Sequence, residues 1–225
     1  MNFHVMTLFP DVINNYVKES IIGRAINNNI ISVNAVNIRD FSKDKHKKVD
    51  DYPYGGGAGL LMSAVPIYDA YKSICDTNNL IKPRVIYVTP WGHKFTQNTA
   101  RELAKEENLI FLCGHYEGVD ERALDLIATD FYSIGDYVLT GGELPSLVMI
   151  DAISRMIKGV LGNDISGETE SFSDKYLEHP QYTRPEEFMG MKVPDVLLSG
   201  HHQNIEKWRR EEAIKRTEKF RPDLL

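Results

Sequence analysis

The fold class is decided by residues 84–118, RVIYVTPWGHKFTQNTARELAKEENLIFLCGHYEG. The β-branched run at 84–89 predicts a strand that Pro90 closes, because proline lacks the amide hydrogen that a sheet requires. Residues 96–107 are predicted to form a helix, and the short apolar run at 109–113 a second, buried strand. A strand, a helix and a strand in this order favour two parallel strands joined by a crossover helix.

The same alternation extends over the first 160 residues. Two more strands are predicted at 3–9 and 32–38, and a turn-rich stretch at 50–59. Further helices are predicted at 11–28, 63–76 and 120–128, with a last one that begins with Pro145 in its first turn. Strands separated by helices predict an α/β fold with a mostly parallel sheet covered on both faces.

The character of the chain changes at Gly162. Residues 162–175, GNDISGETESFSDK, have almost no apolar periodicity and are rich in Gly, Ser, Asp and Glu. We therefore predict an α/β domain at 1–161, a flexible linker at 162–178 and a small helical domain at 179–225.

Composition indicates an ordinary globular protein, with 42% hydrophobic and 26% charged residues. The sequence contains no apolar run of the roughly 20 residues that cross a membrane, and residues 1–10 lack the features of a signal peptide. The two cysteines, Cys75 and Cys113, form no CxxC pair, and the seven histidines show no HxxxH or HExxH spacing. We therefore expect no disulfide, no zinc or other metal ligand set, and a cytoplasmic location.

The formal net charge of −6 argues against a non-specific nucleic-acid coat but leaves room for a local RNA-binding patch. Residues 39–48 carry five Lys or Arg against two Asp, and residues 207–221 carry seven Lys or Arg. Solvated charged surfaces have the same composition, so each patch remains open between RNA contact and simple solvation.

Four glycine-rich segments lie at 54–59, 89–92, 114–118 and 135–142. The last three follow strand-like runs, where glycine lets the backbone turn and approach a ligand closely. None matches the P-loop pattern, and no GxGxxG follows the first strand, so the sequence argues against a P-loop nucleotidase and against a Rossmann dinucleotide site. The alternative for any single segment is a tight turn without a ligand.

Six blocks of sequence, in this order, resemble the bacterial tRNA (guanine-N(1)-)-methyltransferases of the TrmD family, which belong to the SPOUT superfamily. The resemblance covers essentially the whole chain. The blocks are VDD at 49–51 with PYGGG at 53–57, GHYEGVDER at 114–122, SIGDYVL at 133–139 with GGELP at 141–145, GVLG at 159–162, YTRP at 182–185 and VLLSG at 196–200.

The resemblance implies a SPOUT-type sheet with a deep trefoil knot, a homodimer with the active site at the subunit interface, and methyl transfer from S-adenosylmethionine to ring nitrogen 1 of guanosine at position 37 of tRNA. It implies no DNA or membrane partner. Asp50 and Gly59 would contact the guanine or the tRNA. The residues implied for the methyl donor are Tyr87, Val88, Thr89, Pro90, Gly114, Tyr116, Glu117, Gly118, Ser133, Ile134, Gly135, Tyr137, Leu139, Gly141, Gly142 and Pro145.

Methylation at this ring nitrogen requires removal of its proton and stabilisation of the charge that moves to the neighbouring oxygen. The resemblance assigns the cation to Arg155 and the base to a linker aspartate, which is replaced here by Glu170. Glu168 and Asp174 are the other candidates for the base. Without the resemblance, Arg155 would be read as an ion-pair partner of Asp151 and the acids as linker solubilisers.

Glu117 is implied to lie near the donor, and the sequence does not decide whether its carboxylate faces the sulfonium, the amino group or a magnesium ion. Three other positions depart from the family pattern, namely Trp91, Lys158 and His201, where Gln, Pro and Asn are common. Trp91 either stacks on a base or packs within its loop. Many family members continue beyond the position of Leu225, and a shorter C-terminal unit is expected to grip tRNA more weakly.

Two other functions remain open at this stage. One is a SPOUT-fold RNA-binding protein with weak or no methyl transfer, because the base position has changed. The other is a related SPOUT enzyme that modifies ribose or a different base.

Overall fold

The computed structural model describes residues 1–162, 171–172 and 176–225. The chain forms two compact units, Met1–Gly162 and Asn163–Leu225, which are described separately. Among the described residues, none of the helices has the length and apolar character needed to cross a membrane. Most of the predicted linker, including Glu170, Glu168 and Asp174, lies outside the described residues.

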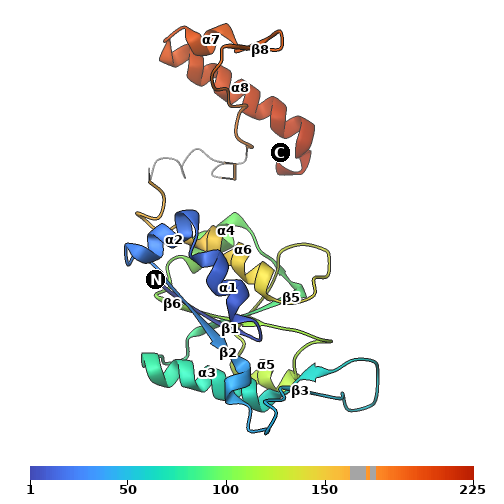
Figure 1. Ribbon diagram of the computed structural model, residues 1–225. Coiled ribbons are helices and arrows are strands. Elements are labelled where there is room, and N and C mark those ends of the chain that lie inside the picture. Colours follow the sequence, from blue (N-terminus) through green and yellow to red (C-terminus); the bar gives the residue numbers. More distant parts are fainter. Residues whose placement is uncertain (163–170, 173–175) are drawn as a thin grey trace. The chain divides into compact units, whose positions relative to one another are not determined.

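The first unit contains a five-stranded sheet in the order β2-β1-β6-β5-β7, and every neighbouring pair is parallel (Figure 1). Its strands are β1 (Asn2–Thr7), β2 (Ser32–Asn37), β5 (Arg84–Lys94), β6 (Asn108–Cys113) and β7 (Asp130–Ser133). The predicted α/β class and parallel sheet are confirmed. The trefoil knot stays a prediction.

One face of the sheet is covered by α1 (Pro10–Val17), α2 (Ser20–Asn27), α4 (Gln97–Leu103) and α6 (Glu143–Ser154) (Figure 1). Side chains alternate along a strand, so Phe3 and Val5 of β1 point to this layer, where they pack with Ile13 and Ile150. Strands covered on both faces must be almost wholly apolar, which explains the run LIFLC in β6.

The opposite face is covered by α3 (Ala64–Asn78), α5 (Glu121–Ile127) and the 3-10 turn η1 (Ile38–Phe41). Met6 of β1 points to this second layer and packs with Ile67 and Leu124. The short strands β3 (Asp50–Asp51) and β4 (Leu61–Met62) pair antiparallel within the predicted turn-rich stretch and bring its ends together.

The helix predicted at 11–28 is wrong in one respect, because α1 and α2 are separate helices. Ser20, the first residue of α2, takes a left-handed φ of 54°. A Cβ at Gly23 would meet the Lys18 carbonyl oxygen at 2.1 Å, so only glycine lets α2 pack this closely against the end of α1. Apolar periodicity continues through the break from Ile13 to Ala25 and therefore conceals it.

Pro90 does not end its strand, which corrects the sequence prediction. β5 continues to Lys94 through a register shift between Val88 and His93, and the irregularity accommodates the proline. The helix predicted at 96–107 is shorter, since α4 ends at Leu103. The last helix of this unit begins at Glu143, so Pro145 lies in its first turn, as predicted.

The second unit is not purely helical. Besides α7 (Asp195–Leu198), α8 (His202–Phe220) and the 3-10 turn η3 (Pro222–Leu224), it contains the hairpin of β8 (Glu187–Phe188) and β9 (Met191–Lys192). Met189 and Gly190 connect these strands with φ angles of 50° and 81°, as a two-residue hairpin turn requires. Trp208 of α8 packs near His179 and Tyr182, with ring centroids 6.3 Å from each.

His4 of β1 predicts acid sensitivity of the first unit. It is 4% exposed, and its ring nitrogens have no hydrogen-bond partner within the described part of the chain. Burial lowers the pKa of His4, although the nearby Asn108 side chain opposes the shift. The unfolded chain therefore binds a proton at a higher pH than the folded chain, and the free energy of unfolding falls as pH decreases below about 6.5.

We expect a slope of up to about 1.4 kcal/mol per pH unit from this group. Urea unfolding at pH 5–7.5 measures it, with His4→Leu as the comparison because leucine cannot titrate. The same pH slope in both proteins would contradict the assignment to His4.

Candidate functional site

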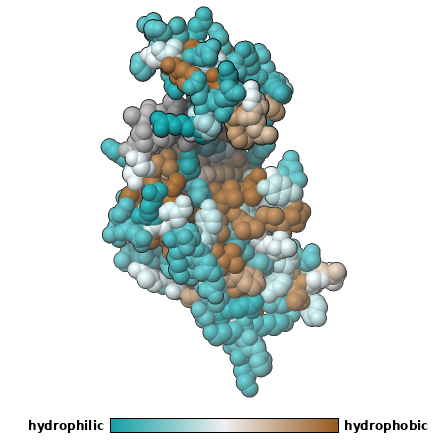
Figure 2. Space-filling view, turned by 45° about the horizontal axis from the view of Figure 1, so that its top comes forward, coloured by the Kyte–Doolittle hydropathy of each residue, from teal (hydrophilic) through white to brown (hydrophobic). Residues whose placement is uncertain are grey.

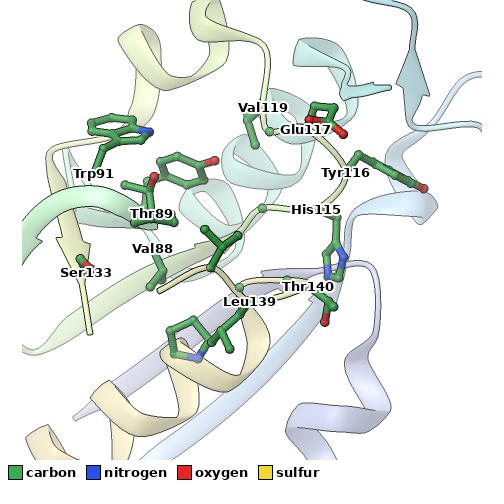
Figure 3. A pocket seen from close by; sticks show the side chains of 18 of the residues that line it. Val88, Thr89, Trp91, His115, Tyr116, Glu117, Val119, Ser133, Leu139 and Thr140 are labelled. Atoms are coloured by element: carbon green, nitrogen blue, oxygen red, sulfur yellow. The ribbon is translucent and has the colours of Figure 1, made fainter. Parts of the chain in front are cut away.

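A cavity of about 570 Å³ lies beyond the carboxyl ends of β5, β6 and β7, where ligands bind in parallel α/β sheets (Figure 3). Its walls come from residues 87–91, 114–119, 133–135 and 137–142, with Leu61, Glu121, Leu124 and Pro145. Every residue that the sequence analysis assigned to donor binding lines this cavity. The structure therefore brings them together, although their binding roles stay a prediction.

The loop after β7 packs very tightly against the loop after β6. A Cβ at Gly142 would lie 2.6 Å from the Cys113 Cα, and the Gly142 amide donates to the Gly114 carbonyl at 3.0 Å. A Cβ at Gly114 would in turn meet the Tyr87 hydroxyl at 2.8 Å. These glycines allow three segments of the chain to approach one another closely. Glycines that served only to form tight turns would not need such contacts.

The loop at 114–118 is also held in place by the segment that precedes α3. Its Tyr116 has a left-handed φ of 59°, which is costly for an aromatic residue. The Glu117 amide donates to the Leu60 carbonyl at 3.0 Å, and the Met62 amide donates to the Gly118 carbonyl at 2.9 Å. The segment before α3 therefore supports one wall of the cavity.

An aromatic group forms another part of the wall. The Trp91 ring packs on Phe131 with centroids 5.0 Å apart and lies 6.2 Å from the Tyr87 ring. Trp91 remains 64% exposed and lines the cavity, so it packs within its loop and also presents surface to a ligand (Figure 3). Burial, with the charge of Glu121, raises the pKa of Tyr87 to about 12, so this wall stays uncharged.

The acidic residues at the cavity are Glu117 and Glu121. Gly59 lies directly against Glu117, because a Cβ at Gly59 would meet the Glu117 Cγ at 2.4 Å. Asp50 pairs with Met62 in the hairpin of β3 and β4, one strand away from the loop at 114–118. Among the described residues, there is no group of three or more His, Cys, Asp or Glu that could hold a metal ion.

Of the two predicted catalytic residues, Arg155 is described, and it is not among the residues that line the cavity. Arg155 is half-buried and follows the last residue of α6. Ten residues of helical rise, roughly 15 Å, separate it from Pro145 at the cavity end of that helix. Glu170 lies outside the described residues, as do Glu168 and Asp174.

Sequence reasoning missed three polar side chains beneath the cavity. Glu143 is 5% exposed and accepts hydrogen bonds from Thr7 and His115, which lie at the ends of β1 and β6. Acidic residues are common in the first turn of a helix because their negative charge interacts favourably with the helix dipole. The sequence therefore carries no signal that Glu143 is buried. Cys113 is fully buried nearby, and burial raises its pKa, which makes it a poor nucleophile.

The two basic patches differ in their surroundings. At 39–48, the Arg39 guanidinium donates to the Tyr116 hydroxyl at 3.4 Å, so this patch adjoins the cavity. In α8, Arg209 and Lys215 pair with Glu206 and Glu212, each at 2.7 Å, within the same helix. Lys43, Lys47 and Lys48 are likewise paired with aspartates, so ion pairs weaken the positive field of both patches. The contact of Arg39 with the cavity residue Tyr116 makes the patch at 39–48 the stronger candidate for phosphate contact near the cavity.

Comparison with known proteins is consistent with this geometry. The family model described as tRNA (Guanine-1)-methyltransferase TrmD matches residues 1–225. The chain belongs to the TrmD family. A family member from Lachnospira eligens, named tRNA (guanine-N(1)-)-methyltransferase, is 64% identical, and the alignment covers all of this chain and 94% of the relative. TrmD relatives of the same name from Clostridioides difficile and Lachnoclostridium phytofermentans are 59% and 56% identical, with 100% of this chain and 97% and 91% of theirs covered.

Membership of the TrmD family makes the chain a methyltransferase. The prediction of the family from six sequence blocks is confirmed.

Proposed function

We propose that the protein transfers the methyl group of S-adenosylmethionine to ring nitrogen 1 of guanosine at position 37 of tRNA, beside the anticodon. The observation that carries this proposal is the convergence of three loops, at 87–91, 114–119 and 133–142, on one cavity in a member of the TrmD family. Its volume lies within the range of small-molecule sites, about 300–1,000 Å³.

The residues at the cavity fit this donor. The uncharged ring of Tyr87 and the exposed ring of Trp91 suit a flat purine, while the carboxylates of Glu117 and Glu121 suit a cationic amino acid moiety. When bound, S-adenosylmethionine supplies an electrophilic methyl group on a positively charged sulfur. Magnesium is the alternative cation for Glu117. Its participation can be tested by measuring methyl transfer to tRNA with and without EDTA.

Arg155 and Glu170 supply the remaining chemistry in this proposal. Glu170 accepts the proton of guanine ring nitrogen 1, which frees the lone pair for attack on the methyl group. Arg155 stabilises the negative charge that develops on the neighbouring oxygen. The cavity loops contribute by holding the reacting atoms in line.

We further propose that two copies pair through α1 and α6, so that the Arg155 of one subunit serves the cavity of the other. Phe9, Val12, Tyr16, Leu144 and Val148 are 43–59% exposed on these two helices and their flanks. Figure 2 shows apolar surface gathered on the visible face of the first unit, Met1–Gly162. The Tyr16 hydroxyl donates to Asp151 at 3.0 Å, which places the two helices side by side. Exposed apolar area of this kind usually marks an interface.

Methyl transfer to tRNA transcripts tests the proposed function. Labelled methyl from S-adenosylmethionine is expected to enter transcripts with guanosine at positions 36 and 37, and to be absent when guanosine 37 is replaced by adenosine. Binding of both transcripts without transfer would favour the RNA-binding alternative. Label on ribose or on another base would favour a related SPOUT enzyme.

A further inference from the structure

Three polar side chains form a continuous chain of hydrogen bonds that ends at His115, a residue of the cavity wall. The Thr7 hydroxyl donates to Glu143 Oε1 at 2.5 Å, and the His115 Nε2 lies 2.7 Å from Glu143 Oε2. The Thr7 oxygen also accepts from the Phe9 amide at 2.8 Å, which leaves its hydrogen free for the carboxylate. Glu143 therefore binds the end of β1 and the loop after β6 at the same time.

These groups are shielded from water. Thr7 is fully buried, Glu143 is 5% exposed and the side chain of His115 is 14% exposed. A buried carboxylate is tolerated only where its oxygens have partners, and each Glu143 oxygen has one here. Removing the carboxylate would leave two buried donors without an acceptor, so the surrounding segments would have to move.

The segments that would move are two walls of the cavity. A Cβ at Gly141 would lie 2.2 Å from the His115 ring and 2.8 Å from Glu143 Oε2, so the loop after β7 rests directly on this pair. Figure 3 shows His115 beside Thr140. Tyr116 and Glu117 follow His115 in the loop at 114–118. The contact of Glu143 with His115 therefore joins the hydrogen bond from the Gly142 amide to the Gly114 carbonyl in setting the distance between the loops at 114–118 and 135–142.

We propose that Glu143 is a positioning residue for methyl-donor binding, which acts by fixing the spacing of these two loops through Thr7 and His115. The inference rests on the proposed function, because it concerns the donor cavity. The proposal predicts a selective effect on donor binding. Loss of the network should weaken donor binding strongly and tRNA binding little, since the hydrogen bonds of the network join Thr7, Glu143 and His115, while the bond from the basic patch at 39–48 runs from Arg39 to Tyr116.

Two pairs of variants test the proposal in the full-length protein. Glu143→Ala removes both acceptors, while Glu143→Gln keeps the shape but turns one acceptor into a donor. Thr7→Val removes the hydroxyl, while Thr7→Ser retains it. Calorimetric titration with S-adenosylhomocysteine should show about tenfold to hundredfold weaker binding for Glu143→Ala, Glu143→Gln and Thr7→Val, and near-normal binding for Thr7→Ser. The KM for tRNA should change less than about twofold.

Asp130→Asn is the matched control. Asp130 is also a largely buried carboxylate, and it accepts from Arg84 at 2.8 Å, but it lies at the start of β7, at the opposite end of the sheet from the cavity. It should lower the thermal midpoint without weakening donor binding. Normal donor affinity in Thr7→Val and Glu143→Gln, or an equal loss in Asp130→Asn, would overturn the proposal.

The wild-type protein separates this inference from the proposed function. If it binds S-adenosylhomocysteine and methylates tRNA while the variants bind equally well, only the positioning role fails. If the wild-type protein binds no donor, both proposals fail. Should Glu143→Ala not fold, the Thr7 pair still gives the comparison.

Discussion

Arg155→Ala is expected to lower the rate of methyl transfer by about 10²–10³-fold, the usual effect of removing one group that stabilises a developing oxyanion. Donor binding should remain within about twofold of the wild-type value, because the proposed role of Arg155 is at the guanine oxygen and Arg155 is not among the residues that line the donor cavity. Single-turnover transfer and titration with S-adenosylhomocysteine measure the two quantities separately. A loss of donor affinity as large as the loss of rate would make Arg155 a structural residue instead.

Mixing inactive subunits tests whether Arg155 acts across the proposed interface. Gly141→Val should block the cavity of its own subunit, because a Cβ there would lie 2.2 Å from the His115 ring. If each site combines the cavity of one subunit with the Arg155 of the other, mixed dimers of Gly141→Val and Arg155→Ala have one working site. Random mixing should then restore about one quarter of wild-type activity. No recovery would place Arg155 in the active site of its own subunit.

The parallel sheet was predictable because it follows from patterns within short stretches of the sequence. Runs such as RVIYV and LIFLC can be buried on both faces only in a covered sheet, and the helices between them fix the strands as parallel. The break at Ser20 and the continuation of β5 past Pro90 were not predictable in this way. Both depend on contacts with other segments, namely Lys18 against Gly23 and β7 against His93.

The cavity wall was also largely predictable, since glycines at strand ends mark loops that approach one another. The network of Thr7, His115 and Glu143 was not. It joins residues 136 positions apart, and it exists because the strand order places β1 beside β6. Neither periodicity nor a motif of a single segment reports strand order, so this part of the site required the structure.

Glu170→Gln is expected to slow methyl transfer by about 10²–10⁴-fold, the range for loss of a general base. The amide has nearly the same shape as the carboxylate but cannot accept the proton of guanine ring nitrogen 1. Glu170→Asp, which restores the residue common in the family, should keep most of the activity. Single-turnover rates at saturating donor and tRNA separate this chemical step from binding.

The pH dependence supplies an independent criterion. With Glu170→Gln the residual rate should increase as pH rises, because hydroxide in solution then removes the proton that the side chain no longer takes. Equal rates for Glu170→Gln and Glu170→Asp would mean that another acid is the base. Glu168→Gln and Asp174→Asn would then identify it, since only the variant that loses the true base should show the slow, hydroxide-dependent reaction.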